Sequence, residues 1–130
     1  MSEAPKRLVL IVDDEESMRK VLERRVRAWG FEVKSVRDGE EALRAAAQEP
    51  PALVLLDVMM PGLDGLEVCR RLKAQAPTHA IPVIFVTAKD SKQFPEQARA
   101  SGVDAYLYKP YDAAALLTLI QKLIGPSGSS

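Results

Sequence analysis

The sequence predicts an α/β fold, with a five-stranded parallel β-sheet and five helices. Short apolar runs typical of buried strands alternate with longer segments in which apolar residues recur at helical spacing. The connections between these segments are short. Strict alternation of this kind is typical of a parallel sheet whose strands are joined by right-handed helical crossovers.

The first half of the chain contains three strand signals and two helix signals. The apolar stretch LVLIV predicts a strand over residues 7–12. A helix over 17–29 follows, with apolar residues at helical spacing and arginine and glutamate on the opposite face. The sequence FEVKSV predicts a strand over 31–36, and a periodic pattern predicts a helix over 40–48. The run LVLL indicates the third strand, over 53–56.

The second half continues the alternation. A helix is expected over 66–75, and the run VIFV predicts a strand over 83–86. The fourth helix is expected over 95–101, because a proline is tolerated in the first turn of a helix. A short strand over 105–108 and a helix over 112–124 complete the pattern. We expect Gly30 and Gly102 to cap the helices that they follow.

The order of the strands also follows from their composition. The first, third and fourth runs are continuously apolar, as in strands that are covered on both faces. The second run alternates, and the fifth is short and carries two tyrosines, so both are expected at the edges. The predicted fold is therefore a flavodoxin-like doubly wound sheet with the order 2-1-3-4-5.

Composition excludes several classes of protein. The chain has 130 residues, of which 47% are hydrophobic, and this suits one domain with one core. No apolar run approaches the ~20 residues of a membrane span, and the first residues do not form a signal peptide. A net charge of zero argues against direct nucleic-acid binding. With one histidine and one cysteine, the chain cannot form a Cys/His zinc site.

The single cysteine also bears on the setting of the protein. Cys69 cannot form an internal disulfide, which fits a reducing, cytoplasmic environment. Its spacing from Leu66 and Leu72 predicts a buried core thiol. His79, in a stretch between a helix and a strand, is expected to be a solvated loop residue.

Polar residues stand where four of the predicted strands end. They are Asp13, Asp14, Asp57, Thr87 and Lys109. Each alone has an ordinary explanation, as the start of a solvated loop or the end of a strand. Because the carboxyl ends of parallel strands meet at one edge of the sheet, we expect all five to converge in one crevice.

These residue types suit metal-assisted phosphoryl transfer. Mg²⁺ prefers oxygen ligands, so Asp14 and Asp57 are candidate direct ligands, with Asp13 acting through water and a backbone carbonyl from the loop after Asp57. A carboxylate can attack phosphorus and form an acyl phosphate. Lys109 would neutralise charge on the transferring oxygens, and Thr87 would donate its hydroxyl to one of them.

The motifs VDDEESMR, LVLLDVMMPGLDGLEV, VIFVTAKD and DAYLYKPY resemble the CheY-like receiver family of two-component response regulators, and the match runs over residues 8–124. The resemblance implies that Asp57 accepts a phosphoryl group from a phosphohistidine on a sensor kinase. It also implies that Asp13 and Asp14 hold Mg²⁺, together with the backbone carbonyl of Met59.

Further expectations come from the same resemblance. Thr87 and Lys109 would contact the phosphoryl group, and Tyr106 would turn inward on activation. A cis peptide bond is implied between Lys109 and Pro110. In the MPGLDG stretch, which predicts a tight turn before the third helix, Gly62 and Gly65 are expected to be turn residues.

The implied function is that of a signalling phospho-acceptor rather than an enzyme, one that promotes its own phosphorylation and dephosphorylation. Its implied partners are a sensor histidine kinase or phosphotransfer protein, and an output domain or target protein. Residues 1–124 would form the receiver domain, and 125–130 a flexible linker or a tag tail.

Two surfaces carry further expectations. The kinase is expected to dock on the first helix, at a charged face made of Arg19, Lys20, Glu23, Arg24 and Arg27. Receivers of winged-helix regulators usually carry charges that pair across a dimer, but here Ala105, Thr118 and Gln121 stand where such charges would be expected. We therefore expect the output to follow another route.

Three alternatives remain. A haloacid-dehalogenase-like phosphatase would carry a second aspartate two residues after its nucleophile, where this chain has Met59. Dinucleotide binding needs a glycine-rich first turn, where this chain has DDEES. A degenerate receiver acting as a phosphorylation-independent interaction module would normally lack one of the five site residues, and all five are present.

Overall fold

Five strands and five helices alternate along residues 7–126, the part of the chain that the computed structural model describes. The elements are β1 (Leu8–Val12), α1 (Glu16–Ala28), β2 (Glu32–Val36), α2 (Gly39–Gln48), β3 (Leu53–Leu56), α3 (Gly65–Ala74), β4 (Val83–Thr87), α4 (Phe94–Ser101), β5 (Ala105–Tyr108) and α5 (Ala113–Ile124). Each predicted element is present, and its ends lie within one residue of the predicted bounds. Part of the expected tail, residues 127–130, lies outside the described residues, as do residues 1–6.

The strands form one parallel sheet in the order β2-β1-β3-β4-β5, which confirms the predicted topology. β3 and β4 are buried along their whole length, and β1 is buried except at Leu8. β2 and β5 are partly exposed, as expected of edge strands. The continuous apolar runs and the alternating run were therefore sufficient signals for the strand order.

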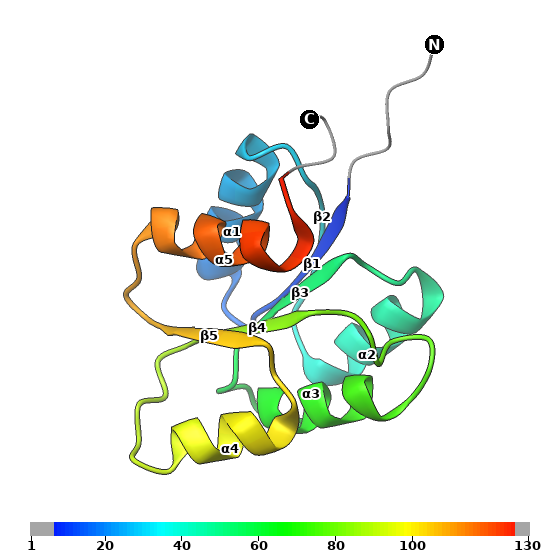
Figure 1. The fold of residues 1–130 in the computed structure, drawn as a ribbon, viewed down its shortest axis with the longest axis vertical. Coiled ribbons are helices and arrows are strands. Elements are labelled where there is room, and N and C mark those ends of the chain that lie inside the picture. Colours follow the sequence, from blue (N-terminus) through cyan, green and yellow to red (C-terminus); the bar gives the residue numbers. More distant parts are fainter. Residues whose placement is uncertain (1–6, 127–130) are drawn as a thin grey trace.

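Helices cover both faces of this sheet. In Figure 1, α1 and α5 lie on one face, and α2, α3 and α4 lie on the other. Val9 and Ile11 belong to the core beneath α1 and α5, whereas Leu10 and Val12 belong to the core beneath the other three helices. Successive residues of a strand point to opposite faces, so a continuously apolar strand supplies both cores.

Register brings the polar strand ends together. β1 pairs Val12 with Leu56 of β3, so Asp13 and Asp57 leave the sheet next to one another. At the other side, β4 pairs Thr87 with Tyr108 of β5, and the amide of Lys109 donates to the Thr87 carbonyl at 2.8 Å. The polar residues at the ends of β1, β3, β4 and β5 therefore lie at one edge of the sheet, as expected.

Glycines with positive φ stand at the ends of two helices. Gly102, with a φ of 84°, is the C-cap of α4 as predicted, whereas Gly30, with a φ of 98°, follows the C-cap of α1, which is Trp29. α4 begins at Phe94, with Pro95 in its first turn. Cys69 is fully buried and donates its thiol hydrogen to the Ser101 carbonyl, and burial raises the pKa of this thiol. His79 is exposed, as expected.

The glycines before α3 have different roles, which corrects one expectation. Gly62 has a φ of 76° and is a turn residue, as predicted. Gly65 does not have positive φ and is the first residue of α3. A Cβ at Gly65 would lie 2.4 Å from the Asp57 carbonyl oxygen and 2.7 Å from the Val58 Cα. Gly65 therefore allows the start of α3 to pack directly against the backbone of Asp57.

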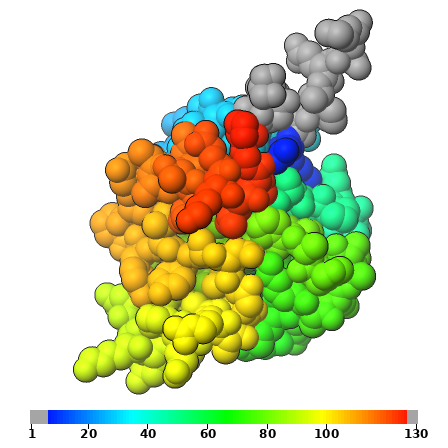
Figure 2. Space-filling view, in the orientation of Figure 1, coloured from blue at the N-terminus to red at the C-terminus, as the bar shows by residue number. Residues whose placement is uncertain are grey.

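One face of the molecule combines α4, β5 and α5. In Figure 2, α5 in orange to red lies above β5, and α4 in yellow lies below it. Thr118 and Gln121 are exposed on α5, so this face lacks charges at both positions. None of the helices over residues 7–126 combines the length and the apolar composition that crossing a bilayer requires.

Candidate functional site

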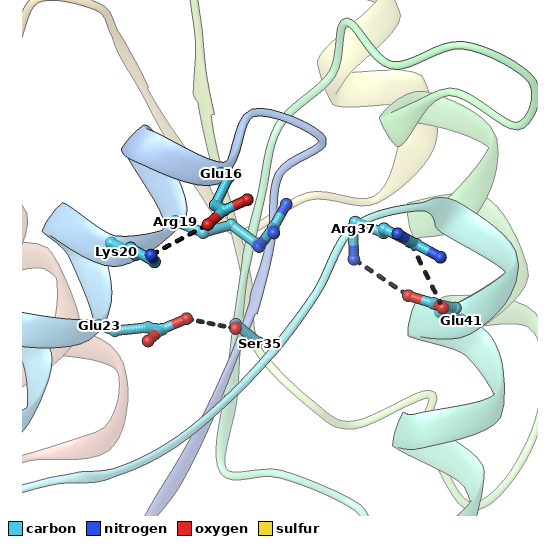
Figure 3. Close-up of a pocket in the computed structure, with 7 residues that line it drawn as sticks. All are labelled: Glu16, Arg19, Lys20, Glu23, Ser35, Arg37 and Glu41. Carbon is cyan, nitrogen blue, oxygen red and sulfur yellow. Dashed lines mark hydrogen bonds and ion pairs between the residues drawn. The ribbon is translucent and has the colours of Figure 1, made fainter.

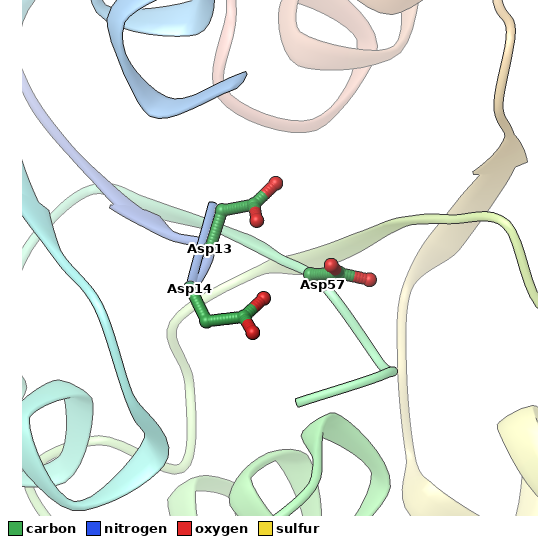
Figure 4. A group of neighbouring side chains, drawn as sticks. All are labelled: Asp13, Asp14 and Asp57. Carbon is green, nitrogen blue, oxygen red and sulfur yellow. The ribbon is translucent and has the colours of Figure 1, made fainter. Parts of the chain in front are cut away.

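Three carboxylates meet where β1 and β3 end. Asp13, Asp14 and Asp57 each offer one carboxylate oxygen, and these atoms lie within 4.8 Å of one another. Figure 4 shows Asp13 and Asp14 leaving the end of β1 beside Asp57 at the end of β3. Asp13 and Asp57 are buried, with 2% and 8% of their surface exposed, whereas Asp14 faces solvent. The cluster thus has a protected interior and one open side.

Lys109 is the cation of the site. Its Nζ lies 3.2 Å from the Asp13 carboxylate and 3.6 Å from the Asp57 carboxylate, and its side chain is 18% exposed. The peptide bond between Lys109 and Pro110 is cis, as the family resemblance implied. One ammonium group thereby bridges the ends of β1, β3 and β5.

Backbone amides hold the two buried carboxylates. The amide of Glu15 donates to Asp13 Oδ1 at 3.0 Å, and the amide of Met59 donates to Asp57 Oδ1 at 3.2 Å. Asp13 Oδ2 is the oxygen that faces Lys109, so both oxygens of Asp13 have partners. At Asp57, Oδ1 bonds to the amide and Oδ2 faces Lys109 at the longer distance.

Burial and neighbouring charges shift two pKa values in the site. Burial raises the pKa of the Asp57 carboxyl, and the nearby carboxylates of Asp13 and Asp14 add to this effect, while Lys109 opposes it. Burial alone would lower the pKa of Lys109, but Asp57 and Asp13 together outweigh it and raise that pKa. Burial beside two other carboxylates therefore makes the charged form of Asp57 less favourable than that of an exposed aspartate.

The donor set fits a hard divalent cation. Three carboxylate oxygens lie within 4.8 Å of one another, and one of the three residues is open to solvent, where water can complete an octahedral shell. Such a cation would also relieve the repulsion that raises the Asp57 pKa. The residues present therefore suit Mg²⁺ and offer none of the sulfur or imidazole ligands that softer metals prefer.

Thr87 and Tyr106 occupy different surroundings. Thr87 is fully buried at the end of β4, and its hydroxyl oxygen accepts from the Lys89 amide at 3.1 Å. Tyr106 packs outside the acid cluster, with its ring edge-on to Phe94 at 5.2 Å between centroids and close to Tyr108. Thr87 is thus linked to the loop after β4, and Tyr106 to the start of α4.

Arg19 lies next to the acid cluster, a position that the sequence did not predict. Arg19 was expected on the exposed charged face of α1, but it is half-buried and donates to the Asp13 carbonyl at 2.9 Å. Glu23 is also half-buried and accepts from Ser35. The exposed part of the predicted docking face is therefore Lys20, Arg24 and Arg27. The position of Arg19, one turn into the helix that follows the end of β1, was the feature of the sequence that could have indicated this contact.

The raised pKa of Asp57 predicts a pH-dependent stability of the metal-free protein. At pH values above 3.8, the ordinary pKa of this carboxyl, Asp57 binds more protons in the folded protein than in the unfolded chain. The free energy of unfolding therefore falls as the pH rises through the pKa of the folded state. We expect Asp57→Asn, which removes this charge, to be more stable than wild type at pH 7 by about 1 kcal/mol, or about 3–5 °C.

Thermal melts in EDTA measure this effect. The difference between the two proteins should shrink as the pH falls toward 4, and wild type should gain more than the variant when Mg²⁺ is added. Asp112→Asn is the matched control, because Asp112 is an exposed N-cap of α5 and asparagine caps equally well. An Asp57→Asn protein that is less stable than wild type at pH 7 would show that the charge of Asp57 does not destabilise the metal-free fold.

The chain resembles known proteins over most of its length. Residues 9–121 match the response regulator receiver domain family. The response regulator PleD of Caulobacter vibrioides is 42% identical over 115 residues, which cover 88% of this chain and 25% of PleD. The chain spans about half or less of the length of the curated relatives that it matches.

Solved structures agree with this match. The chemotaxis protein CheY4 of Vibrio cholerae superposes with a TM-score of 0.84 at 29% identity, covering 94% of this chain and 99% of CheY4. The receiver domain of the sensor histidine kinase PA1611 from Pseudomonas aeruginosa gives 0.85 at 32% identity, covering 92% of this chain and 98% of that domain. In PA1611 a magnesium ion is coordinated in the active-site cleft. The chain belongs to the response regulator receiver domain family of two-component signalling.

Proposed function

We propose that this receiver domain accepts a phosphoryl group on Asp57 in a Mg²⁺-dependent reaction and changes conformation to pass on a signal. The observation that carries the proposal is the convergence of Asp57 with Asp13, Asp14 and Lys109 at the carboxyl edge of the sheet. The donor would be a phosphohistidine of a sensor kinase or phosphotransfer protein. The domain would promote this transfer and the later hydrolysis of the acyl phosphate.

The transfer moves one phosphoryl group between two nucleophiles. A carboxylate oxygen of Asp57 attacks phosphorus, the Asp57 O–P bond forms, and the N–P bond of the phosphohistidine breaks. The electron pair of that bond stays on the imidazole nitrogen, which then takes a proton. Asp57 suits the role of nucleophile because its raised pKa marks a more basic carboxylate.

The metal would be held by Asp13, Asp14 and Asp57, with the backbone carbonyl of Met59 completing the protein ligands. When bound, Mg²⁺ neutralises negative charge on the phosphoryl oxygens and on the carboxylates. Asp13 is fixed by the Glu15 amide and by Lys109, so it presents its oxygens from a defined position.

Two further side chains would act on the phosphoryl group. Lys109 lies 3.6 Å from Asp57, so an oxygen transferred to Asp57 would lie within reach of its ammonium group. Thr87 would donate its hydroxyl to a second oxygen. Its oxygen now accepts from the Lys89 amide, so a shift of the hydroxyl would also move the loop after β4.

Labelling with a small phosphodonor tests the proposal. Wild-type protein incubated with acetyl phosphate and Mg²⁺ should gain one phosphate that is stable in acid and lost in base, and EDTA should prevent the gain. A chain that stays unlabelled under these conditions would favour the alternative, a degenerate receiver acting as a phosphorylation-independent interaction module.

Thr87→Ala should still be phosphorylated but should switch poorly. The hydroxyl is the proposed link between the phosphoryl oxygen and the loop after β4, and Tyr106 would fill the space that this movement opens. We expect fluoroberyllate to produce smaller NMR shifts around Tyr106 in the variant than in wild type. Thr118→Ala, an exposed hydroxyl on α5, is the control. Shifts of wild-type size in Thr87→Ala would rule out this coupling.

The kinase would dock on α1, next to the acid cluster. Lys20, Arg24 and Arg27 are exposed there. Beside them, α1 and the loop after β5 enclose a groove of about 350 Å³, lined by Met18, Val21, Arg25, Lys109, Pro110 and Tyr111. Val21 is 40% exposed, so an apolar strip with basic neighbours leads to Lys109 and hence to Asp57. A partner with apolar and acidic side chains fits this surface.

Reversing the charges of Arg24 and Arg27 to glutamate should slow phosphotransfer from a kinase that phosphorylates the wild-type chain, by roughly tenfold or more. Labelling by acetyl phosphate should stay unchanged, because neither side chain contacts the carboxylates. The matched control reverses Arg44 and Arg99, which are exposed on α2 and α4. Equal slowing of both reactions in the α1 variant would indicate a damaged site instead of a docking surface.

Output would involve the α4-β5-α5 face without a charge-paired dimer. Thr118 and Gln121 are exposed on that face, and they offer no ion pair to a second copy. We also propose a cytoplasmic setting, in which the single cysteine stays reduced. The output domain or target protein would then be the partner on this face, and nucleic acid would not be bound directly.

A further inference from the structure

Arg19 has no part in the proposed phosphoryl transfer, but its side chain is held beside the site. It lies on the first turns of α1, and its guanidinium donates to the backbone carbonyl of Asp13 at 2.9 Å. It also lines a groove of about 210 Å³ between α1, β2 and α2. Figure 3 shows its side chain in this groove, between Lys20 and Arg37. Both of those neighbours pair with glutamates, whereas the bond of Arg19 goes to the strand end.

The carbonyl that Arg19 contacts belongs to the peptide that joins Asp13 to Asp14. The Asp13 amide is used by β2, at 3.3 Å from the Val36 carbonyl, and the Asp13 side chain is used by Glu15 and Lys109. Arg19 therefore supplies the remaining anchor of this residue. Because the peptide group is planar, a hydrogen bond that fixes its carbonyl also fixes the direction of the bond from its nitrogen to the Cα atom of Asp14.

We propose that Arg19 is a positioning residue for the divalent-cation site, acting through the Asp13 carbonyl to orient Asp13 and Asp14 toward Asp57. This inference rests on the proposed metal site and adds a residue to it. Arg19 touches neither the cation nor the reacting atoms. Its role resembles that of partners that orient metal ligands, whose loss typically weakens metal binding by roughly 10- to 100-fold.

Charge and geometry predict opposite results for the removal of Arg19. A nearby positive charge repels a cation, so if charge alone mattered, Arg19→Ala would bind Mg²⁺ more tightly. If positioning matters more, as proposed, Arg19→Ala binds Mg²⁺ roughly tenfold more weakly. The sign of the change therefore separates the two roles.

The experiment is a titration of the metal-free protein with Mg²⁺, followed by NMR or calorimetry, for wild type, Arg19→Ala, Arg19→Lys and Lys20→Ala. We expect weaker binding in Arg19→Ala and partial recovery in Arg19→Lys, which keeps a positively charged donor group. Lys20→Ala removes a positive charge from the same helix without a contact to Asp13, and it should bind Mg²⁺ at least as tightly as wild type.

A second readout separates positioning from general damage. In labelling by acetyl phosphate, Arg19→Ala should need more Mg²⁺ for half-maximal rate but approach the wild-type rate at saturating Mg²⁺. Binding in Arg19→Ala that equals or exceeds wild type would overturn the inference and leave the metal site standing. A wild-type protein that does not bind Mg²⁺ would instead refute the proposed function.

Discussion

Asp57→Asn is expected to accept no phosphate from acetyl phosphate in the presence of Mg²⁺, while wild type is labelled once. Three carboxylates share the cluster, but their surroundings differ. Asp13 and Asp57 each accept from a backbone amide and face Lys109, but Lys109 lies closer to Asp13, at 3.2 Å. Asp57 lies at the end of the central strand β3, keeps the longer 3.6 Å distance to Lys109 and has a raised pKa. Lys109 therefore lies farther from Asp57 than from Asp13, which favours Asp57 as the proposed carboxylate that attacks phosphorus.

Intact-mass spectrometry of the variant measures the outcome directly. Asp64→Asn is the matched control, because Asp64 caps α3 in the same loop and asparagine keeps the cap, so labelling should persist. Asp57→Asn should also remain folded, as its melting curve will show. Labelling of Asp57→Asn to the wild-type level would move the acceptor to another carboxylate and would overturn the site assignment.

The fold was predictable because its signals are local. Each strand and helix has its own hydrophobic period, and the degree of apolar continuity separated the central strands from β2 and β5. Two of the differences of one residue arise at helix starts, where capping decides the boundary. Asp38 and Asp64 accept from amides three residues later, so α2 and α3 each begin one residue before the apolar pattern does.

The convergence of site residues was predictable because parallel strands end at one edge. The sequence placed Asp13, Asp57, Thr87 and Lys109 at strand ends, and register alone then brought them near one another. The hydrogen bond from Arg19 to the Asp13 carbonyl was not predictable in this way, because helical periodicity shows which face a residue occupies but not that a long side chain turns back to a carbonyl.

Gly65 shows the same limit for the backbone. Glycine in a loop before a helix usually indicates positive φ, and that expectation holds for Gly62 only. The reason for Gly65 is a contact between the start of α3 and the end of β3, which depends on how the two elements pack. Contacts of this kind appear only once the elements are assembled.

Gly65→Ala is therefore expected to damage both stability and phosphorylation. The new methyl group would lie 2.4 Å from the Asp57 carbonyl oxygen, well inside van der Waals contact, so α3 or the Asp57 backbone must move. Overpacking of this kind costs about 1–3 kcal/mol. A displacement of a reacting group by about 1 Å can slow a reaction by roughly 100-fold, so we expect labelling of the folded variant to slow at least tenfold.

Gly62→Ala separates the two effects. At Gly62 a Cβ meets nothing within 4 Å, but the φ of 76° is unfavourable for alanine by about 1–2 kcal/mol. Both variants should therefore unfold at lower denaturant concentration, while only Gly65→Ala should lose labelling rate when both are measured fully folded. If the two variants were labelled equally fast, the contact between α3 and Asp57 would stabilise the fold without positioning Asp57 for the reaction. If Gly65→Ala were as stable as wild type, the close approach itself would be wrong.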